Sequence, residues 1–216
     1  MLGELILSGG GDAIQTREMN RYYVRSLDEK KSVLYIPLAG DENYRSYDSC
    51  YEYTCSLFPN TKVTMWTDLR EKTYDDMRSF SGVYMSGGSV NKLLAELVTT
   101  GFDTLLKKFF ADGGIIYGQS AGAIVLGENM KIYEESEPKP TSLKELESLK
   151  LVGGYVIFCH YIKEHEEKVK AFVNENGVPI LAIPDGTAVV ASETSFHTIG
   201  EKPAYLYDRD GNKAIL

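Results

Sequence analysis

The sequence is poor in cysteine, in histidine and in long apolar runs. Its three cysteines, Cys50, Cys55 and Cys159, form no C-x-x-C pair and leave one residue odd, which favours a reducing, cytoplasmic setting over a disulfide scaffold. No apolar run approaches the roughly 18 residues that a membrane-spanning helix needs. Residues 1–8 predict a first strand rather than a signal peptide. A membrane partner is therefore not expected.

Basic residues are outnumbered by acidic ones. With 23 Lys and Arg against 31 Asp and Glu, the formal net charge is -8, which argues against nucleic acid as the main partner. The 43% of hydrophobic residues is ordinary for a globular chain and can form a sizeable core without disulfides. No repeat or linker divides the sequence, so we expect a single domain over 1–216. The sequence leaves its oligomeric state, monomer or homodimer, open.

Short apolar runs alternate with helical segments along most of the chain. Strands are expected over residues 5–7, 32–37, 63–66, 82–85, 115–117, 155–159 and 180–183, and antiparallel hairpins over 188–216. This alternation predicts an α/β fold of three layers, in which a mostly parallel sheet carries helices on both faces. Ligands bind beyond the carboxyl ends of the strands in such sheets. The loops at those ends are therefore the places to look for a site.

One of these strands ends in Gly118-Gln119-Ser120-Ala121-Gly122, which matches the nucleophile elbow G-x-S-x-G. The central residue takes strained backbone angles, and small residues on either side let the strand and the following helix pass close to the turn. The hydroxyl of Ser120 would stand at the positive end of the new helix. Ser120 is therefore the expected nucleophile. The alternative is a tight strand–helix turn with a capping serine.

A nucleophilic serine needs a base, and the base usually needs an acid that orients it. His165 lies between glutamates on an expected helix, whereas His160 ends a buried strand. Asp185 follows another buried strand and precedes a glycine, so its carboxylate can also face the crevice. The residues alone leave two triads open. One is Ser120–His160–Asp185, and the other is Ser120–Asp185–His197, which has the chain order of an α/β-hydrolase.

Two glycine-rich loops are expected beside the elbow. Residues 9–12 follow the first strand but lack the third glycine of G-x-G-x-x-G, so nucleotide binding is not expected. Residues 86–89 follow the fourth strand and let backbone amides approach a ligand. No cofactor or metal is implied, because Cys159 and His160 lack partners at ligand spacing. Residues 128–150, rich in glutamate and proline, predict a surface excursion over the site or a plain solvated loop.

These motifs, in this order, resemble the serine peptidase family of dipeptidase E (aspartyl dipeptidase) and cyanophycinase. The resemblance covers most of the chain and is carried by Ser86-Gly87-Gly88 with the Leu93-Leu94 helix, Gly118-Gln119-Ser120-Ala121-Gly122, His160-Tyr161 and Pro184-Asp185-Gly186. That family is similar in fold to class I glutamine amidotransferases, whose elbow carries a cysteine.

The resemblance implies a serine peptidase that hydrolyses small peptides. It assigns Ser120 as nucleophile, His160 as base and Asp185 to the position of the triad acid. It also implies an oxyanion hole formed by the backbone amides of Gly88 and Ala121. The rival expectations are an amide or ester hydrolase with the same triad and a non-catalytic binding protein of the same fold.

Three features depart from the family. Asp185 stands where dipeptidase E has a glutamate, and Ser89-Val90 replace a frequent Asn-Thr pair. The helix after His160 has lysines but no arginine, the residue that is linked to aspartyl specificity in dipeptidase E. Lysine lacks the bidentate fork for a carboxylate, so we expect at most a small preference for Asp-X peptides. A strong preference would require an arginine from elsewhere; the candidates are Arg17, Arg45 and Arg70.

Overall fold

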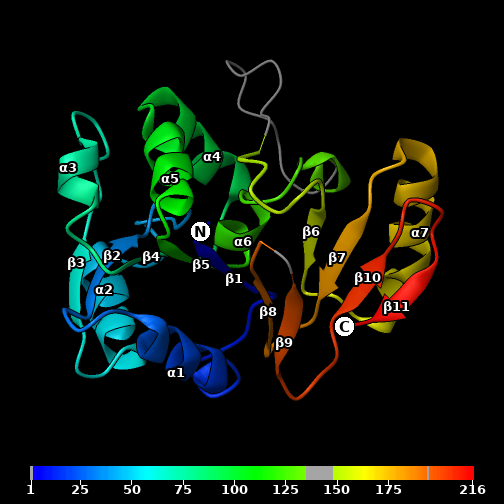
Figure 1. Cartoon of the computed structure of the whole chain (residues 1–216), viewed down its shortest axis with the longest axis horizontal. Coiled ribbons are helices and arrows are strands. Elements are labelled where there is room, and N and C mark those ends of the chain that lie inside the picture. The colour runs from blue at the N-terminus through cyan, green and yellow to red at the C-terminus, as the bar shows by residue number, and fades with distance from the viewer. Residues whose placement is uncertain (1, 135–147, 194) are drawn as a thin grey trace.

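The computed structural model describes residues 2–134, 148–193 and 195–216 (Figure 1). A large sheet has the strand order β3-β2-β4-β5-β1-β8-β9. Its strands are β1 (Glu4–Ser8), β2 (Ser32–Ile36), β3 (Lys62–Met65), β4 (Gly82–Met85), β5 (Ile115–Gln119), β8 (Thr187–Ala191) and β9 (Phe196–Gly200). Strands β1 to β5 run parallel, whereas β8 is antiparallel to β1 and β9 is antiparallel to β8. The prediction of an α/β fold with a mostly parallel central sheet is confirmed.

The strands expected over 155–159 and 180–183 do not join this sheet. They form β6 (Val156–Cys159) and β7 (Ile180–Ile183) in a small sheet of order β11-β10-β7-β6, whose other strands are β10 (Tyr205–Tyr207) and β11 (Lys213–Ile215). Strand β6 runs parallel to β7, and β10 is antiparallel to both β7 and β11. The expectation of one sheet is wrong here: β1 is paired on both sides, with β5 and β8, and β7 pairs instead with β6 and β10.

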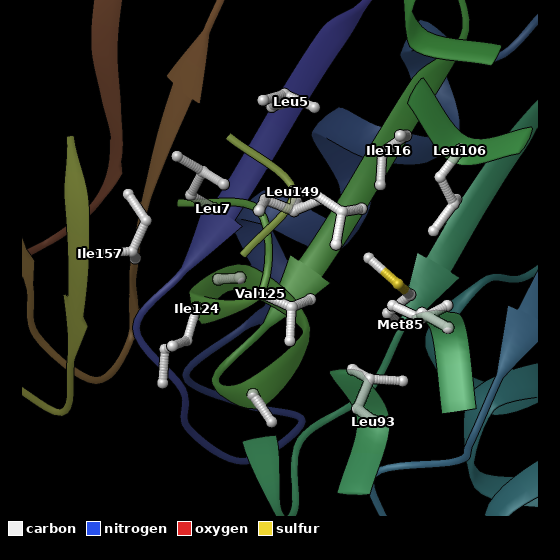
Figure 2. Close-up of a cluster of buried hydrophobic side chains, with 14 of the residues drawn as sticks. Leu5, Leu7, Met85, Leu93, Leu106, Ile116, Ile124, Val125, Leu149 and Ile157 are labelled. Carbon is white, nitrogen blue, oxygen red and sulfur yellow. The ribbon is translucent and has the colours of Figure 1, made fainter. Parts of the chain in front are cut away.

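Side chains alternate between the two faces along each strand, so both faces of the large sheet present apolar side chains. Helices cover both of these faces. Leu5 and Leu7 enter one core cluster, whereas Ile6 enters the cluster on the opposite face. The first cluster is covered by α4 (Val90–Thr99), α5 (Phe102–Ala111) and α6 (Ala121–Ile124), with the short α3 (Tyr74–Met77) at its margin. The second is covered by α1 (Arg17–Ser26) and α2 (Tyr47–Leu57). Figure 2 shows part of the first cluster.

The small sheet shares a core with the large one. One of its faces is covered by α7 (Glu166–Asn176), which follows the 3-10 turn η2 (Lys163–His165) and buries Val169 and Val173 against Phe158. The opposite face sends Ile157 and Leu181 into the first cluster, where Ile157 appears beside α6 in Figure 2. The two sheets are therefore held together by apolar packing.

The excursion expected over 128–150 falls largely on residues 135–147, which lie outside the described residues. Its described ends carry both buried and exposed residues. Ile132, in the 3-10 turn η1 (Lys131–Tyr133), and Leu149 are buried, and the Leu149 amide donates to the Val125 carbonyl at 2.8 Å. Across the described ranges, no helix has both the length and the apolar character that crossing a membrane requires.

Candidate active site

The elbow holds Ser120 in a strained conformation. Its backbone angles are φ 50° and ψ -112°, a region that side chains rarely adopt. The flanking glycines make this possible. A Cβ on Gly118 would lie 2.3 Å from the Gly122 carbonyl oxygen, and a Cβ on Gly122 would lie 2.2 Å from the Met85 carbonyl oxygen. The motif therefore needs glycine at both positions to bring β5, α6 and β4 this close.

Ser120, His160 and Asp185 form a continuous chain of contacts. The Ser120 Oγ lies 2.7 Å from His160 Nε2, and His160 Nδ1 lies 2.7 Å from Asp185 Oδ1. Both distances are those of hydrogen bonds. The His160 and Asp185 side chains are 53% and 43% exposed, so the pair faces solvent at the mouth of the site. A base between a nucleophile and an orienting carboxylate is the arrangement that nucleophilic catalysis requires.

Parallel pairing in the small sheet brings His160 and Asp185 together. Cys159 is in register with Ile183, so the residues that follow both strands emerge at the same edge. His160 comes directly after β6, and Asp185 comes two residues after β7. The His160 amide donates to the Gly9 carbonyl at 3.1 Å. This bond ties His160 to the loop that follows β1 of the large sheet.

The glycine-rich loop after β1 forms the back wall of the histidine–aspartate pair. A Cβ on Gly10 would lie 2.5 Å from His160 Cε1 and 2.6 Å from Asp185 Oδ1. Gly10 also has φ +125°, which side chains disfavour, and its carbonyl accepts a bond from the Gly186 amide at 2.9 Å. The sequence predicted this loop only as a glycine-rich wall beside the elbow. Its role as a steric support for the pair was missed.

The other two histidines lie away from Ser120. His197 is on β9, the outermost strand of the large sheet, where its ring meets the Tyr22 ring edge-on at 5.8 Å. The His165 ring packs against Phe158 at 5.3 Å. Of the two triads that the sequence left open, the structure brings together the side chains of Ser120, His160 and Asp185.

The loop after β4 runs beside the nucleophile. A Cβ on Gly87 would lie 3.2 Å from Ser120 Cβ and 3.7 Å from Ser120 Oγ. Gly88 has φ +141°, and a Cβ there would lie 2.1 Å from the Ala39 carbonyl oxygen, so only glycine fits. Within the described residues, neither the Gly88 amide nor the Ala121 amide donates a hydrogen bond. Both N–H groups are therefore available to a ligand.

A hydrogen-bonded bridge joins this edge of the sheet to the elbow. The Gln119 Nε2 donates to the Gly11 carbonyl at 2.9 Å, and the Tyr84 hydroxyl donates to Gln119 Oε1 at 2.5 Å. Gln119, which lies between Gly118 and Ser120 in the elbow, thus holds the loop after β1 in place. Nothing in the five-residue motif identifies Gln119 as a support, because its partners lie 108 and 35 positions away.

Cys159 lies beneath the elbow but does not offer a second nucleophile. Its Sγ lies 3.6 Å from the Ser8 carbonyl oxygen and 3.7 Å from that of Ser120. Burial, together with the nearby charge of Asp185, raises the pKa of the Cys159 thiol well above its ordinary value. The thiol therefore stays protonated at neutral pH. No group of three or more His, Cys, Asp and Glu side chains in the described ranges is arranged to hold a metal ion.

A cleft of about 810 Å³ opens on the Gly87 side of Ser120. We call it the Arg45 cleft. Its walls come from the loops after β2 and β4 and from the starts of α2 and α4; they include Ala39, Gly40, Asp41, Tyr44, Arg45, Tyr53, Gly88 and Lys92. The sequence left the substrate-binding residues unassigned. Of the three arginines that it offered as candidates, Arg45 lines this cleft and Arg17 and Arg70 do not.

Comparisons with known proteins agree with this geometry. The sequence model of peptidase family S51 matches residues 5–199. A peptidase E of Shewanella putrefaciens is 26% identical over 147 residues, which span 65% of this chain and 62% of that protein. An uncharacterised peptidase of Pasteurella multocida is 35% identical over 81 residues, 37% of this chain and 39% of that protein.

Two solved structures share the fold. A peptidase from an acI-B1 Actinobacterium superposes with a TM-score of 0.74 at 16% identity, covering 100% of this chain and 94% of that one. A candidate peptidase E from Listeria monocytogenes gives a TM-score of 0.72 at 21% identity, covering 94% of this chain and 100% of that one. The family match spans both the elbow and the strands that precede His160 and Asp185. The chain belongs to peptidase family S51.

Proposed function

We propose that this chain is a serine peptidase that hydrolyses small peptides, with Ser120 as nucleophile, His160 as general base and Asp185 as the orienting acid. The observation that carries the proposal is the unbroken series of two 2.7 Å contacts from the Ser120 hydroxyl through the imidazole to the carboxylate. Membership of peptidase family S51 supports the choice of a peptide bond over other acyl compounds.

In the proposed reaction, the Ser120 Oγ attacks the carbonyl carbon of the peptide bond, and the hydroxyl proton passes to His160 Nε2. The carbon–nitrogen bond then breaks, and His160 returns the proton to the leaving amine. A free amine departs and an acyl ester remains on Ser120. Asp185 accepts the Nδ1–H of the imidazole and stabilises the cation that forms while the proton is held.

Hydrolysis of the acyl ester uses the same groups in reverse roles. His160 takes a proton from a water molecule, whose oxygen attacks the ester carbon. The bond to Ser120 Oγ breaks, and the proton passes from His160 back to that oxygen. The products are a carboxylic acid and the free enzyme. One water molecule is consumed for each peptide bond cleaved.

The developing oxyanion is stabilised by the amides of Gly88 and Ala121. Both N–H groups lack an acceptor among the described residues, and a Cβ on Gly87, next to Gly88, would lie 3.7 Å from Ser120 Oγ. The loss of one such donor typically raises the barrier by about 3 kcal/mol. We also propose that the fold is of the class I glutamine amidotransferase type, with serine in place of cysteine at the elbow.

The test combines a covalent probe with substrate turnover. A fluorophosphonate should label Ser120, as mapped by peptide mass spectrometry, and a mixture of dipeptides should both compete with labelling and be hydrolysed. Labelling without hydrolysis of any peptide, but with turnover of simple esters, would replace the peptidase by an ester hydrolase. Absence of both labelling and turnover would leave a binding protein.

A further inference from the structure

The outer edge of β6 has no strand beside it in the described parts of the chain. Strand β6 is the last one of the small sheet, so only its other edge is paired, with β7. All four residues of β6 are buried, and the backbone N–H and C=O groups of a buried edge need partners. The segment after α6 supplies one of them, because the Glu128 amide donates to the Tyr155 carbonyl at 2.9 Å. The part of the edge that leads to His160 needs another partner.

Tyr133, the last residue of η1, covers this part of the edge. Its hydroxyl donates to the Ile157 carbonyl at 3.2 Å and accepts from the Cys159 amide at 2.9 Å. One residue of a neighbouring parallel strand would make the same pair of bonds. The Tyr133 ring stacks on the Phe158 ring, with centroids 5.7 Å apart and planes 17° from parallel, so the hydroxyl is held in place. A single side chain thus takes the part of the missing strand.

The backbone around His160 is fixed from three directions. Three consecutive amides donate to three separate acceptors at 2.9, 3.1 and 3.2 Å: Cys159 to the Tyr133 hydroxyl, His160 to the Gly9 carbonyl and Tyr161 to the Ile183 carbonyl. The second bond leads to the large sheet and the third to β7. Of the three acceptors, only the Tyr133 hydroxyl is a side-chain atom. It is therefore the one anchor that a substitution can remove without altering the backbone.

His160 depends on such anchors because its backbone is strained. Its φ is 56°, in the left-handed region that residues other than glycine rarely adopt. A conformation of this kind persists only where the surrounding structure over-determines it. The imidazole also has to meet Ser120 Oγ and Asp185 Oδ1 at once, each at 2.7 Å. Release of the peptide that precedes His160 lets the backbone relax, and the ring then moves away from these two contacts.

We propose that Tyr133 is a positioning residue for His160. Its hydroxyl fixes the outer edge of β6, and through the Cys159 amide it keeps the imidazole between Ser120 and Asp185. This proposal rests on the proposed function, in which His160 is the general base. Tyr133 does not line the Arg45 cleft, and it acts through the backbone of β6. Its loss should therefore slow the chemical step and leave substrate binding nearly unchanged.

The kinetic test removes one oxygen atom. Tyr133→Phe lacks the hydroxyl but keeps the ring that stacks on Phe158. Because the imidazole is then less well placed, kcat for peptides should fall roughly tenfold while KM changes by less than about twofold. Tyr51→Phe is the matched control, since the Tyr51 hydroxyl also donates to a carbonyl of an outermost strand, Val63 of β3, at 3.2 Å. An unchanged kcat in Tyr133→Phe, or equal falls in both variants, would overturn the proposal.

A second variant separates the hydroxyl from the ring. Tyr133→Leu lacks both, so its melting temperature should be lower than that of Tyr133→Phe, because the stacking on Phe158 is also lost. The kcat of the folded Tyr133→Leu protein should nevertheless lie close to that of Tyr133→Phe, since both lack the bond to the Cys159 amide. A normal kcat in Tyr133→Phe with a low kcat in Tyr133→Leu would assign the effect to the ring and overturn the role of the hydroxyl.

Nuclear magnetic resonance tests the proposal without any turnover, so a failure of the proposed function leaves this result unaffected. In Tyr133→Phe the Cys159 amide should exchange its hydrogen at least roughly tenfold faster. The Val156 amide, which donates to the Pro179 carbonyl at 2.9 Å on the paired side of β6, should keep its rate. The Nδ1–H signal of His160 should shift or broaden as its contact with Asp185 loosens. An unchanged Nδ1–H signal, with or without faster exchange at Cys159, would overturn the positioning role.

Discussion

The large and the small sheet contribute different residues to the candidate site. Ser120 stands at the end of β5, between β4 and β1 of the large sheet, and its position follows from one continuous stretch of chain. His160 and Asp185 come from two separate strands of the small sheet and meet only because β6 and β7 pair in one register. A nucleophile can thus be specified locally, whereas a base–acid pair depends on tertiary pairing.

The candidate site lies at the interface between the two sheets, which we call the joint. The 2.7 Å contact between Ser120 Oγ and His160 Nε2 crosses this joint, and so does the bond from the His160 amide to the Gly9 carbonyl. Apolar side chains fill the space between the two sheets, among them Ile157 of β6 and Val125 at the end of α6. The geometry of the triad is therefore as rigid as the packing between the sheets.

The largest effect is expected when the contact between Ser120 Oγ and His160 Nε2 is removed by changing either residue. Ser120→Ala and His160→Ala should each lower kcat/KM by at least roughly a thousandfold, because triad members act as a unit. The double variant should be little worse than either single one. His197→Ala, on β9, is the control and should keep its activity. Losses that multiply in the double variant would contradict a single catalytic unit.

A second, smaller loss is expected when the acid of the small sheet is changed. Asp185→Asn keeps the shape of the side chain but no longer stabilises the imidazolium, so kcat should fall by up to roughly ten-thousandfold, less than for loss of the nucleophile or the base. Asp185→Glu should recover part of the rate, because it restores the charge but adds a methylene to a contact already at 2.7 Å. Near-normal turnover of Asp185→Asn would assign the orienting role to another group.

The support that the large sheet gives to the small one can be tested at Gly10. In Gly10→Ala the new Cβ would displace His160 and Asp185, and a misplacement of this size should cost roughly a hundredfold in rate. Gly153→Ala is the control, since Gly153 also has positive φ (+57°) but nothing within 4 Å of a Cβ. Both variants should lose about 1–3 kcal/mol of stability from backbone strain. Only Gly10→Ala should lose activity; full activity in this variant would refute the supporting role.

The smallest effect concerns the attachment of α7 to β11 in the small sheet. Hydrogen bonds from Lys170 and Lys213 lower the pKa of Glu166 to about 2, below its ordinary value of 4.5. Because the folded pKa is the lower one, the contribution to stability is present above about pH 4.5 and is lost as the pH falls toward 2.

Glu166→Gln should therefore lower the melting temperature slightly at pH 7, and the difference should shrink steadily between pH 4.5 and pH 2. The exposed Glu164 forms no ion pair with any described residue and supplies the control variant Glu164→Gln. A difference between Glu166→Gln and the wild type that persists unchanged at pH 2 would contradict the ion-pair origin.

The limits of the sequence are visible in the two histidines. His160 directly follows a short strand, and His197 lies within one. The residue pattern alone therefore could not decide which of them lies beside Ser120. The choice depends on whether each strand lies near β5, and the contact between Ser120 and His160 spans 40 positions. The separate small sheet could not be predicted for the same reason. Strand propensity shows that a segment forms a strand but not which other strand it pairs with.

By itself, the sequence determined the strand–elbow–helix around Ser120, since the steric limits of a tight turn act between neighbouring residues and only Gly118 and Gly122 satisfy them. It also determined the alternation that sends Leu5 and Ile6 to opposite faces of one sheet. Only the tertiary structure decided that Gly10 supports the base and that Arg45 opens onto the cleft. Those relations join segments far apart along the chain, and they exist only where packing of the core brings the segments together.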